Sequence, residues 1–168
     1  VYTKETTNSA ELLFFTNHAQ VYKSRASEFG DTKASVLGDY VASRLEMEEG
    51  EVPVFMTVTT DYKGHMLFFF QNGKCAKVPL SSYVTKQNRR KLLKAYSDKA
   101  ELAAMLHLEE ECEIAIFTGG PTASANRLLL AGSALIPEKT TRDTAGVNVV
   151  ALKKNARILK VRPAEGLE

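Results

Sequence analysis

The residues of this 168-residue chain that could do chemistry are chiefly its lysines and arginines, which gather in two blocks. Residues 63–99 carry nine Lys or Arg against one acid, and residues 127–163 carry eight against two. The net charge of the whole chain is only +2, because acids cluster in "EMEEGE" (46–51) and "EEECE" (109–113). Local basic blocks in a nearly neutral chain indicate a surface that meets a polyanion. The plainer alternative is a solvated surface that happens to be rich in lysine.

No pattern in the sequence predicts a catalytic residue or a metal site. The three histidines are scattered without metal-ligand spacing, and they give no basis for a Ser-His-Asp arrangement. Cys75 and Cys112 lie in unlike contexts and are interpreted as reduced thiols rather than a disulfide framework. "TGGPTAS" (118–124) lacks the spacing of a phosphate-binding loop and is interpreted as an exposed hairpin loop.

The elements that must position the cations come from an internal repeat. "LLFFTNHAQVYKSRASEF" (12–29) aligns without a gap on "MLFFFQNGKCAKVPLSSY" (66–83), so that Lys23 matches Lys77. Each copy opens with an apolar run typical of a strand buried on both faces. In the second copy Asn72-Gly73 follows, which favours a type I′ hairpin turn before the return strand. A weaker third opening strand is predicted at "LLLA" (128–131).

A second shared element extends the repeat to nearly the whole chain. "LEMEEGEVPVFM" (45–56) resembles "LHLEEECEIAIF" (106–117), and "LKKNARILKV" (152–161) occupies the same place in a third copy. We therefore predict one domain over residues 1–168. Three units share it, at about 1–60, 61–122 and 123–163. Each unit is expected to be a small antiparallel sheet, and because none could bury both faces alone, the units must pack together.

Two stretches carry helical signals. "ASVLGDYVASRL" (34–45) places apolar residues on one helical face and predicts a short helix. "RRKLLKAYSDKAELAAMLHLEE" (89–110) has high helix propensity, yet the repeat requires strands in "KLLKAY" (91–96) and near "AAMLHL" (103–108). We predict strands there, since tertiary context commonly overrides propensity.

The repeated segments resemble the blade motif of a C-terminal domain found in bacterial type IIA topoisomerases, in the A-type subunits of DNA gyrase and topoisomerase IV. The shared features are an apolar strand, an Asn-Gly turn, a Lys-containing strand and a Pro-Leu-Ser segment. "NRRKLLKAYSDKA" (88–100) and "KTTRDTAGVNVVALKK" (139–154) resemble the segments that join blades, and the latter has the Arg-x-Thr-x-Gly-Val run. The resemblance covers nearly the whole chain. It implies an all-β fold, a propeller-like β-pinwheel of about three blades.

The resemblance also implies a function. The rim of such a domain binds and bends double-stranded DNA without reading its sequence, in an enzyme that alters DNA topology using ATP. The domain itself is non-catalytic and needs no cofactor, with ATP and Mg²⁺ expected elsewhere in the parent enzyme. Its partners there are a second A-type subunit and the B-type subunits, which are ATPases. The expected location is cytoplasmic, with the nucleoid. No glycine-rich, QRRGGKG-like gyrase box is present, which favours a topoisomerase IV-like or divergent gyrase-like parent.

The candidate phosphate contacts are cations of the return strands and of the loops that follow them, since a bent duplex needs Lys and Arg repeated along a curve. They are Lys23, Lys33, Lys74, Lys77, Lys86, Arg89, Arg90, Lys91, Lys94, Lys139 and Arg142. The densest cluster, at 89–91, is the strongest candidate, because Arg can fork onto phosphate oxygens. The acidic runs at 46–51 and 109–113 are expected to be turns that face away from DNA.

A competing interpretation is a propeller-like protein-interaction module without DNA binding, because one fold hosts many functions. Cations along one curved rim would favour DNA, and an apolar rim would favour a protein partner. We expect no membrane span, because no apolar run reaches the roughly 18 residues that a spanning helix needs. The start at Val1 suggests an excised piece of a longer protein.

Overall fold

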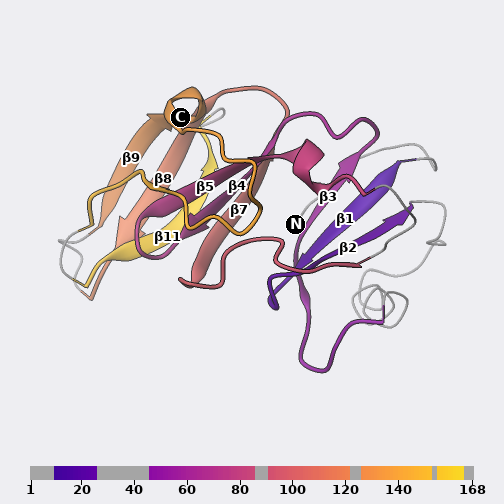
Figure 1. Ribbon diagram of the computed structural model, residues 1–168. Helices are drawn as coiled ribbons and strands as arrows, with labels where there is room; N and C mark the ends of the chain where they lie inside the picture. Colours follow the sequence, from indigo (N-terminus) through magenta and orange to yellow (C-terminus); the bar gives the residue numbers. More distant parts are fainter. Residues whose placement is uncertain (1–9, 26–45, 86–90, 122–125, 153–154, 165–168) are drawn as a thin grey trace, which may run out of the picture. The chain divides into compact units, whose positions relative to one another are not determined.

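The computed structural model describes residues 10–25, 46–85, 91–121, 126–152 and 155–164, and it consists of short antiparallel strands (Figure 1). The strands are β1 (Glu11–Thr16), β2 (Val21–Arg25), β3 (Pro53–Thr59), β4 (His65–Phe70), β5 (Lys74–Pro79), β6 (Lys91–Leu92), β7 (Leu102–Leu108), β8 (Glu113–Gly119), β9 (Arg127–Gly132), β10 (Val147–Asn148) and β11 (Arg157–Pro163). Two 3₁₀ turns, η2 (Leu80–Tyr83) and η4 (Ser133–Leu135), follow β5 and β9. The predicted helix at 34–45 lies outside the described residues, and within the described ones no helix is long and apolar enough to cross a membrane.

The strands form three antiparallel sheets, which confirms the all-β prediction. Sheet A has the order β3-β1-β2-β6, sheet B has the order β10-β5-β4-β7, and sheet C has the order β11-β8-β9. In sheets A and B a two-residue strand from a distant part of the chain pairs with the outer side of the return strand. This strand is β6 beside β2 in sheet A and β10 beside β5 in sheet B. In sheet C, β9 has no such outer partner among the described residues.

The strands β6 and β7 settle the conflict between propensity and repeat in favour of the repeat. Leu102–Leu108 pairs along the whole of β4, from His65↔Leu108 to Phe70↔Leu102. Lys91–Leu92 adds to the edge of β2. β4 is buried on both faces, so residues 102–108 gain sheet contacts when they pair with it. An isolated helix of the same residues would lack these contacts, which is why the strand forms despite the helix propensity.

The turn between β4 and β5 differs from the predicted type I′ form. The loop has three residues, 71–73, and Gly73 has φ +88° while Asn72 is absent from the positive-φ positions. This is the three-residue hairpin in which a left-handed residue closes the loop. The first copy uses Ala19 in the same role, with φ +55°. Asn-Gly therefore marked the hairpin correctly but not its turn type.

The third unit begins earlier than predicted. Its opening strand is β8, and the run at 128–131 belongs to the return strand β9, which pairs with β8 from Glu113↔Gly132 to Thr118↔Arg127. The opening strand of the third unit was predicted one strand too late, because β8 and β9 are both short and apolar. The sheets also do not follow three consecutive segments: β6 follows the β4–β5 hairpin but joins the sheet of β1 and β2, and β10 follows the β8–β9 hairpin but joins the sheet of β4 and β5.

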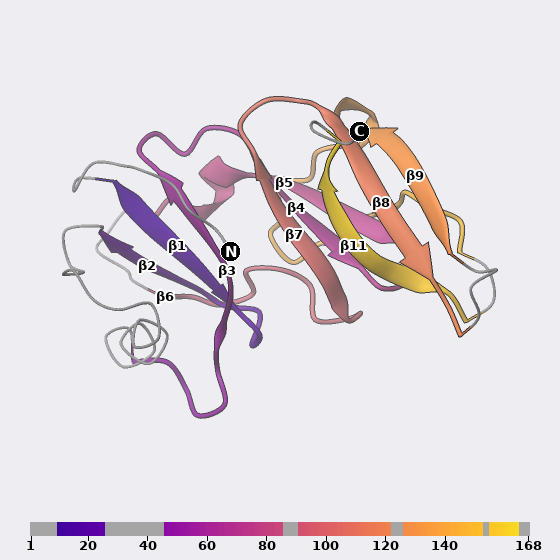
Figure 2. The same ribbon diagram turned by 180° about the vertical axis from the view of Figure 1, so that it is seen from behind.

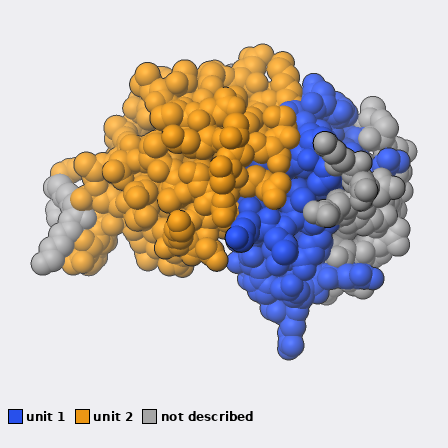
Figure 3. All heavy atoms as spheres, in the orientation of Figure 1, with its two compact units in different colours: residues 1–62, 83–95 blue, residues 63–82, 96–168 orange. Residues whose placement is uncertain are grey.

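The chain divides into two compact units, one of residues 1–62 and 83–95 and one of residues 63–82 and 96–168 (Figure 3). The first holds sheet A, with an apolar cluster around Phe14 and Val58. The second holds sheets B and C, and Figure 2 shows β8 and β11 beside β7 and β4. Its core joins Leu67 and Phe69 of sheet B to Ile114 and Ile116 of sheet C.

Candidate nucleic-acid interface

The outer edge of sheet B carries a segment that brings several predicted cations together. The amide of Lys139 donates to the carbonyl oxygen of Lys77 at 2.9 Å, and the amide of Val149 donates to that of Gly73 at 3.0 Å. Between them, β10 pairs with β5. Gly146 is required for this close approach: its φ is +83°, and a Cβ there would lie 2.3 Å from the carbonyl oxygen of Cys75. The segment 138–149 therefore follows the β5 edge.

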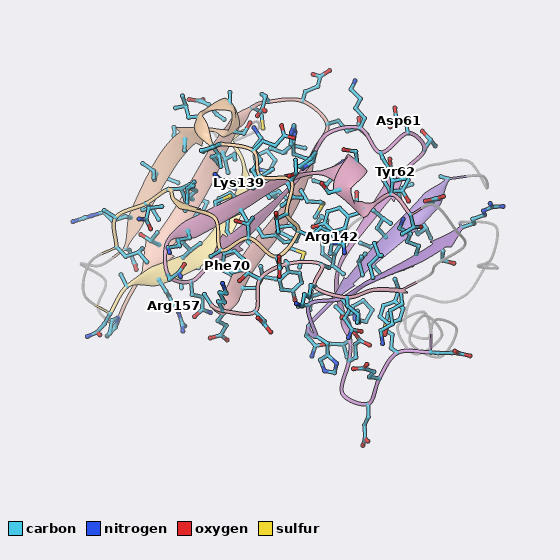
Figure 4. All side chains as sticks on the ribbon, viewed as in Figure 1. Asp61, Tyr62, Phe70, Lys139, Arg142 and Arg157 are labelled. Carbon is cyan, nitrogen blue, oxygen red and sulfur yellow. The ribbon has the colours of Figure 1, made fainter. Side chains whose placement is uncertain are left out.

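Three predicted cations lie along this edge. Lys74, on β5, is half-buried, Lys139 is exposed, and Arg142 is half-buried. The guanidinium of Arg142 donates to the carbonyl oxygen of Ser82 at 3.2 Å, which fixes the chain between η4 and β10 (Figure 4). A single hydrogen bond leaves most of the five guanidinium N–H donors for another acceptor.

The outer edge of sheet A has an equivalent arrangement. Lys91 and Leu92 pair with β2, and the amide of Ala95 donates to the carbonyl oxygen of Ala19 at 2.8 Å. The hydroxyl of Tyr83 holds the same turn through the carbonyl oxygen of Ala95 at 2.6 Å. This segment carries Lys91, which is half-buried, and Lys94, which is exposed with φ +52°.

Lys91 is engaged by an acidic side chain. Its Nζ lies 3.0 Å from Oε1 of Glu48 and 5.6 Å from the centre of the Tyr22 ring. The hydrogen bond to Glu48 raises the pKa of Lys91, and the hydrogen bonds from Lys91 and His18 lower the pKa of Glu48. The run 46–51 was expected to face away from DNA, and Glu48 of this run contacts one of the predicted phosphate-binding cations. A ligand phosphate would have to compete with this carboxylate for Lys91.

Glu51, in the same acidic run, has a structural role. Its carboxylate is buried and accepts hydrogen bonds from the hydroxyls of Thr16 and Tyr22, each at 2.5 Å, and from the amide of Glu48 at 3.0 Å. Burial alone would raise the pKa of Glu51, but these hydrogen bonds outweigh it and the pKa is lowered. Burial and the bond to Glu51 raise the pKa of Tyr22 to about 12.

His18, Glu48 and Glu51 bring three potential metal-ligand atoms within 4.8 Å of one another. Their side chains already have partners in the protein. Glu48 pairs with Lys91 and His18, and Glu51 is held by the donors described above. The group is therefore accounted for as a hydrogen-bonded network that fixes the loop before β3.

Lys23 and Lys77, the pair that defined the repeat, are buried rather than exposed on a rim. Lys23 is 8% exposed, donates to the hydroxyl of Thr85 at 3.2 Å and lies 5.1 Å from the centre of the Tyr62 ring. Lys77 is 4% exposed and pairs with Glu111. The expectation that both contact phosphate is corrected here, because their strands are covered on both faces and each ammonium has partners inside the protein.

The remaining predicted cations, Lys33, Lys86, Arg89 and Arg90, lie outside the described residues. Other exposed cations were counted in the basic block 127–163 but not singled out by the sequence. They are Arg127 at the start of β9 and Arg157, Lys160 and Arg162 on β11. On β11 the buried positions are Ile158 and Val161, and the apolar type of these two residues is the signal that could have indicated that the cations beside them are exposed.

No family model and no curated protein sequence matches the chain. Solved structures do match. One described as the C-terminal domain of DNA topoisomerase IV has a TM-score of 0.72 and 20% identity, and the match covers 93% of this chain and 47% of that one. The DNA gyrase A C-terminal domain gives a TM-score of 0.61 and 17% identity, with 95% and 50% covered. The E. coli ParC C-terminal domain gives 0.65 and 11%, with 93% and 62% covered.

These similarities show the fold. The chain has the β-pinwheel fold of the topoisomerase IV and gyrase A C-terminal domains, as the sequence predicted. It spans about half the length of the first two structures that it matches.

Proposed function

We propose that this chain binds duplex DNA, without reading its sequence, as part of the C-terminal domain of an A-type protein of a bacterial type IIA topoisomerase. The observation that carries the proposal is the equivalence of two edges. In sheet A and in sheet B, the outer edge of the return strand is lined by a segment from elsewhere in the chain, and both segments carry cations. A repeated basic edge on a pinwheel is what sequence-independent binding of a long polyanion requires.

The proposed phosphate contacts are the accessible cations of these edges. They are Lys74, Lys139 and Arg142 on sheet B and Lys91 and Lys94 on sheet A. Lys33, Lys86, Arg89 and Arg90 remain candidates from the sequence alone. Lys23 and Lys77 leave the set and stabilise the sheets instead. Bending of the duplex is part of the proposal, because cations placed on separate repeats would favour a curved path.

We further propose that the domain is non-catalytic and serves an ATP-dependent enzyme whose ATP and Mg²⁺ sites lie elsewhere. In that enzyme it would work with a second A-type subunit, with B-type ATPase subunits, and in the cytoplasm close to the nucleoid. The absence of a gyrase box from the sequence favours a topoisomerase IV-like or divergent gyrase-like parent. The matched structures include domains of both enzymes.

The direct experiment is an electrophoretic titration of two duplexes of unrelated sequence at low salt. The wild-type chain should bind both with similar affinity, and the double reversal Lys139→Glu and Arg142→Glu should weaken both at least tenfold. The matched control is Lys160→Glu with Arg162→Glu, which makes the same charge change on sheet C and should bind as the wild type does. Equal weakening by both variants would mean that net charge alone, and not the edge, decides binding.

A protein-interaction role is favoured by one separate observation, the exposed leucines of sheet C and of the turn η4 that follows β9. Leu128, Leu130, Leu135 and Leu159 are each at least half exposed. Phosphate groups make no favourable contact with exposed leucines, so a partner that covers these side chains would have to be a protein.

A further inference from the structure

Glu48 reaches Lys91 from the opposite edge of sheet A. The strand order is β3-β1-β2-β6, so the run that leads into β3 and the strand that carries Lys91 belong to opposite edges (Figure 2). The carboxylate oxygen Oε1 of Glu48 nevertheless lies 3.0 Å from Nζ of Lys91. The run before β3 therefore passes the turn between β1 and β2 and brings a carboxylate to the far edge of the sheet.

Hydrogen bonds to the β1–β2 turn hold this run in place. The side chain of Asn17 accepts from the amide of Val52 at 2.8 Å and donates to the carbonyl oxygen of Gly50 at 3.1 Å. The amide of Asn17 donates to the carbonyl oxygen of Val52 at 3.1 Å. Nδ1 of His18 lies 3.2 Å from Oε2 of Glu48, the oxygen that does not face the lysine. The fold itself therefore places this carboxylate.

Sheet B has no cation at the position of Lys91. The gapless repeat places Val21 of β2 on Cys75 of β5. Their outer partners are the second residue of β6 and the first residue of β10, which are therefore equivalent. The residue before each of these partners is equivalent too, and it is Lys91 in sheet A and Gly146 in sheet B.

Sheet B has no carboxylate at the position of Glu48 either. The amide of Gln71, the counterpart of Asn17, donates to the carbonyl oxygen of Glu101 at 2.8 Å. Glu101 therefore corresponds to the last residue before β3. Four residues earlier, sheet A has Glu48 and sheet B has Ser97, which is buried. The cation and the carboxylate thus occur together in one sheet and are replaced together in the other.

The two edges consequently offer their cations in different states. On sheet B, Lys139 is exposed, and within the described parts of the chain neither Lys139 nor Arg142 forms an ion pair with a carboxylate. On sheet A, Lys91 is already paired. Its partner Glu48 has a side chain that is 51% exposed, and an ion pair so open to water is weak enough to be exchanged for another anion.

We propose that Glu48 masks Lys91 in the free protein and that a phosphate of the bound duplex displaces it. This inference rests on the duplex binding proposed above and concerns the regulation of that site. The exchange is possible because a neutralised phosphate releases counterions from the duplex. The displaced carboxylate stays close to the phosphates, and like charges repel, so Glu48 lowers the affinity of this edge. A carboxylate that only fastened β6 to the sheet would instead support binding.

The test is a titration of a linear duplex at low salt with four variants of the chain. Glu48→Gln should tighten binding about two- to fivefold, because it frees Lys91 from an exposed ion pair. Glu49→Gln is the matched control: it removes the same charge from the neighbouring exposed residue and should bind as the wild type does. Lys91→Met should bind more weakly than the wild type. Adding Glu48→Gln to Lys91→Met should change nothing further, because no cation is left to unmask.

Three results would overturn the masking by Glu48. They are binding by Glu48→Gln that is equal to or weaker than that of the wild type, equal tightening by Glu49→Gln, and tightening by Glu48→Gln that persists in the Lys91→Met background. Circular dichroism and urea unfolding check that each variant keeps its sheets. A wild type that binds no duplex would overturn the proposed function together with the masking. Intact binding by the wild type with any of the three results overturns the masking alone.

Discussion

The ammonium Nζ of Lys77 lies 2.5 Å from Oε1 of Glu111 and donates a second hydrogen bond to the carbonyl oxygen of Ser133 at 3.0 Å. The hydroxyl of Ser133 in turn donates to the other oxygen of Glu111. Lys77 belongs to β5, Glu111 precedes β8 and Ser133 follows β9. One buried cation thus ties together three segments that are far apart in the sequence, and its ammonium is engaged within the protein.

Replacement of Lys77 by Met should leave duplex affinity within about twofold of the wild type, since the ammonium is covered. The free energy of unfolding should fall modestly: the change removes one partner of the ion pair, but the carboxylate of Glu111 that is left behind is 44% exposed and can be solvated. The measurement is an electrophoretic titration together with urea unfolding. A loss of affinity as large as that of Lys139→Glu with Arg142→Glu would restore Lys77 to the binding surface.

Replacement of Glu111 by Gln should be more harmful than replacement of Lys77 by Met. It leaves the buried ammonium of Lys77 without its anionic partner, and a buried group that loses its partner costs about 1–3 kcal/mol of unfolding free energy. Urea unfolding at neutral pH measures this directly. The matched control is Glu110→Gln, a neighbouring exposed carboxylate, which should change the free energy by less than about 0.5 kcal/mol.

The fate of Lys77 shows how far the sequence could lead. The apolar runs 13–15 and 67–69 predicted strands buried on both faces, and the structure confirms them. Lys23 and Lys77, on the return strands, were nevertheless predicted to contact phosphate, because burial of the opening strands does not by itself show that their partner strands are covered. The sequence could not show the partner of Lys77 either, because Glu111 lies 34 positions away in a run that was interpreted as a turn. Neither the burial of the repeated lysines nor their pairing was therefore predicted.

The prediction of the third repeat was wrong for a different reason. Both β8 and β9 are short and apolar, and the repeated Leu-rich pattern was matched to the wrong one. The insertion of β6 and β10 into preceding sheets was also beyond reach, since a two-residue strand leaves almost no periodic signal. The Gly-Val pair of the joining segment, Gly146-Val147, does coincide with the start of β10, because only glycine fits against Cys75 at that point.

Acid should destabilise the chain through Glu51. Its pKa is lower in the folded state than in the unfolded chain, so its contribution is complete above the ordinary carboxyl pKa of about 4.3 and is lost as the pH falls below it. Glu51→Gln should lower the unfolding free energy at pH 7 by about 1–3 kcal/mol. Urea unfolding between pH 3 and pH 7 should then show a flatter pH dependence for the variant. Parallel curves for the two proteins would contradict this role.

Gly146→Ala should detach β10 from β5 without changing any charge. The new Cβ would meet the carbonyl oxygen of Cys75 at 2.3 Å, and φ +83° is unfavourable for Ala. We expect faster hydrogen exchange at the amide of Val149 and weaker duplex binding, because Lys139 and Arg142 lose their placement. Gly132→Ala is the control: its φ is −79° and the nearest atoms to a Cβ lie at 3.8 Å, so both properties should be unchanged.

The central claim is that two cation-bearing edges bind duplex phosphates, and the salt dependence of affinity tests it most directly. The logarithm of the binding constant should fall linearly with the logarithm of salt concentration, by about 0.9 per neutralised phosphate. For Lys139→Glu with Arg142→Glu the slope should be shallower by about 2, while Lys160→Glu with Arg162→Glu should keep the wild-type slope. A wild-type affinity that does not change with salt, or identical slopes for all three proteins, would contradict the account.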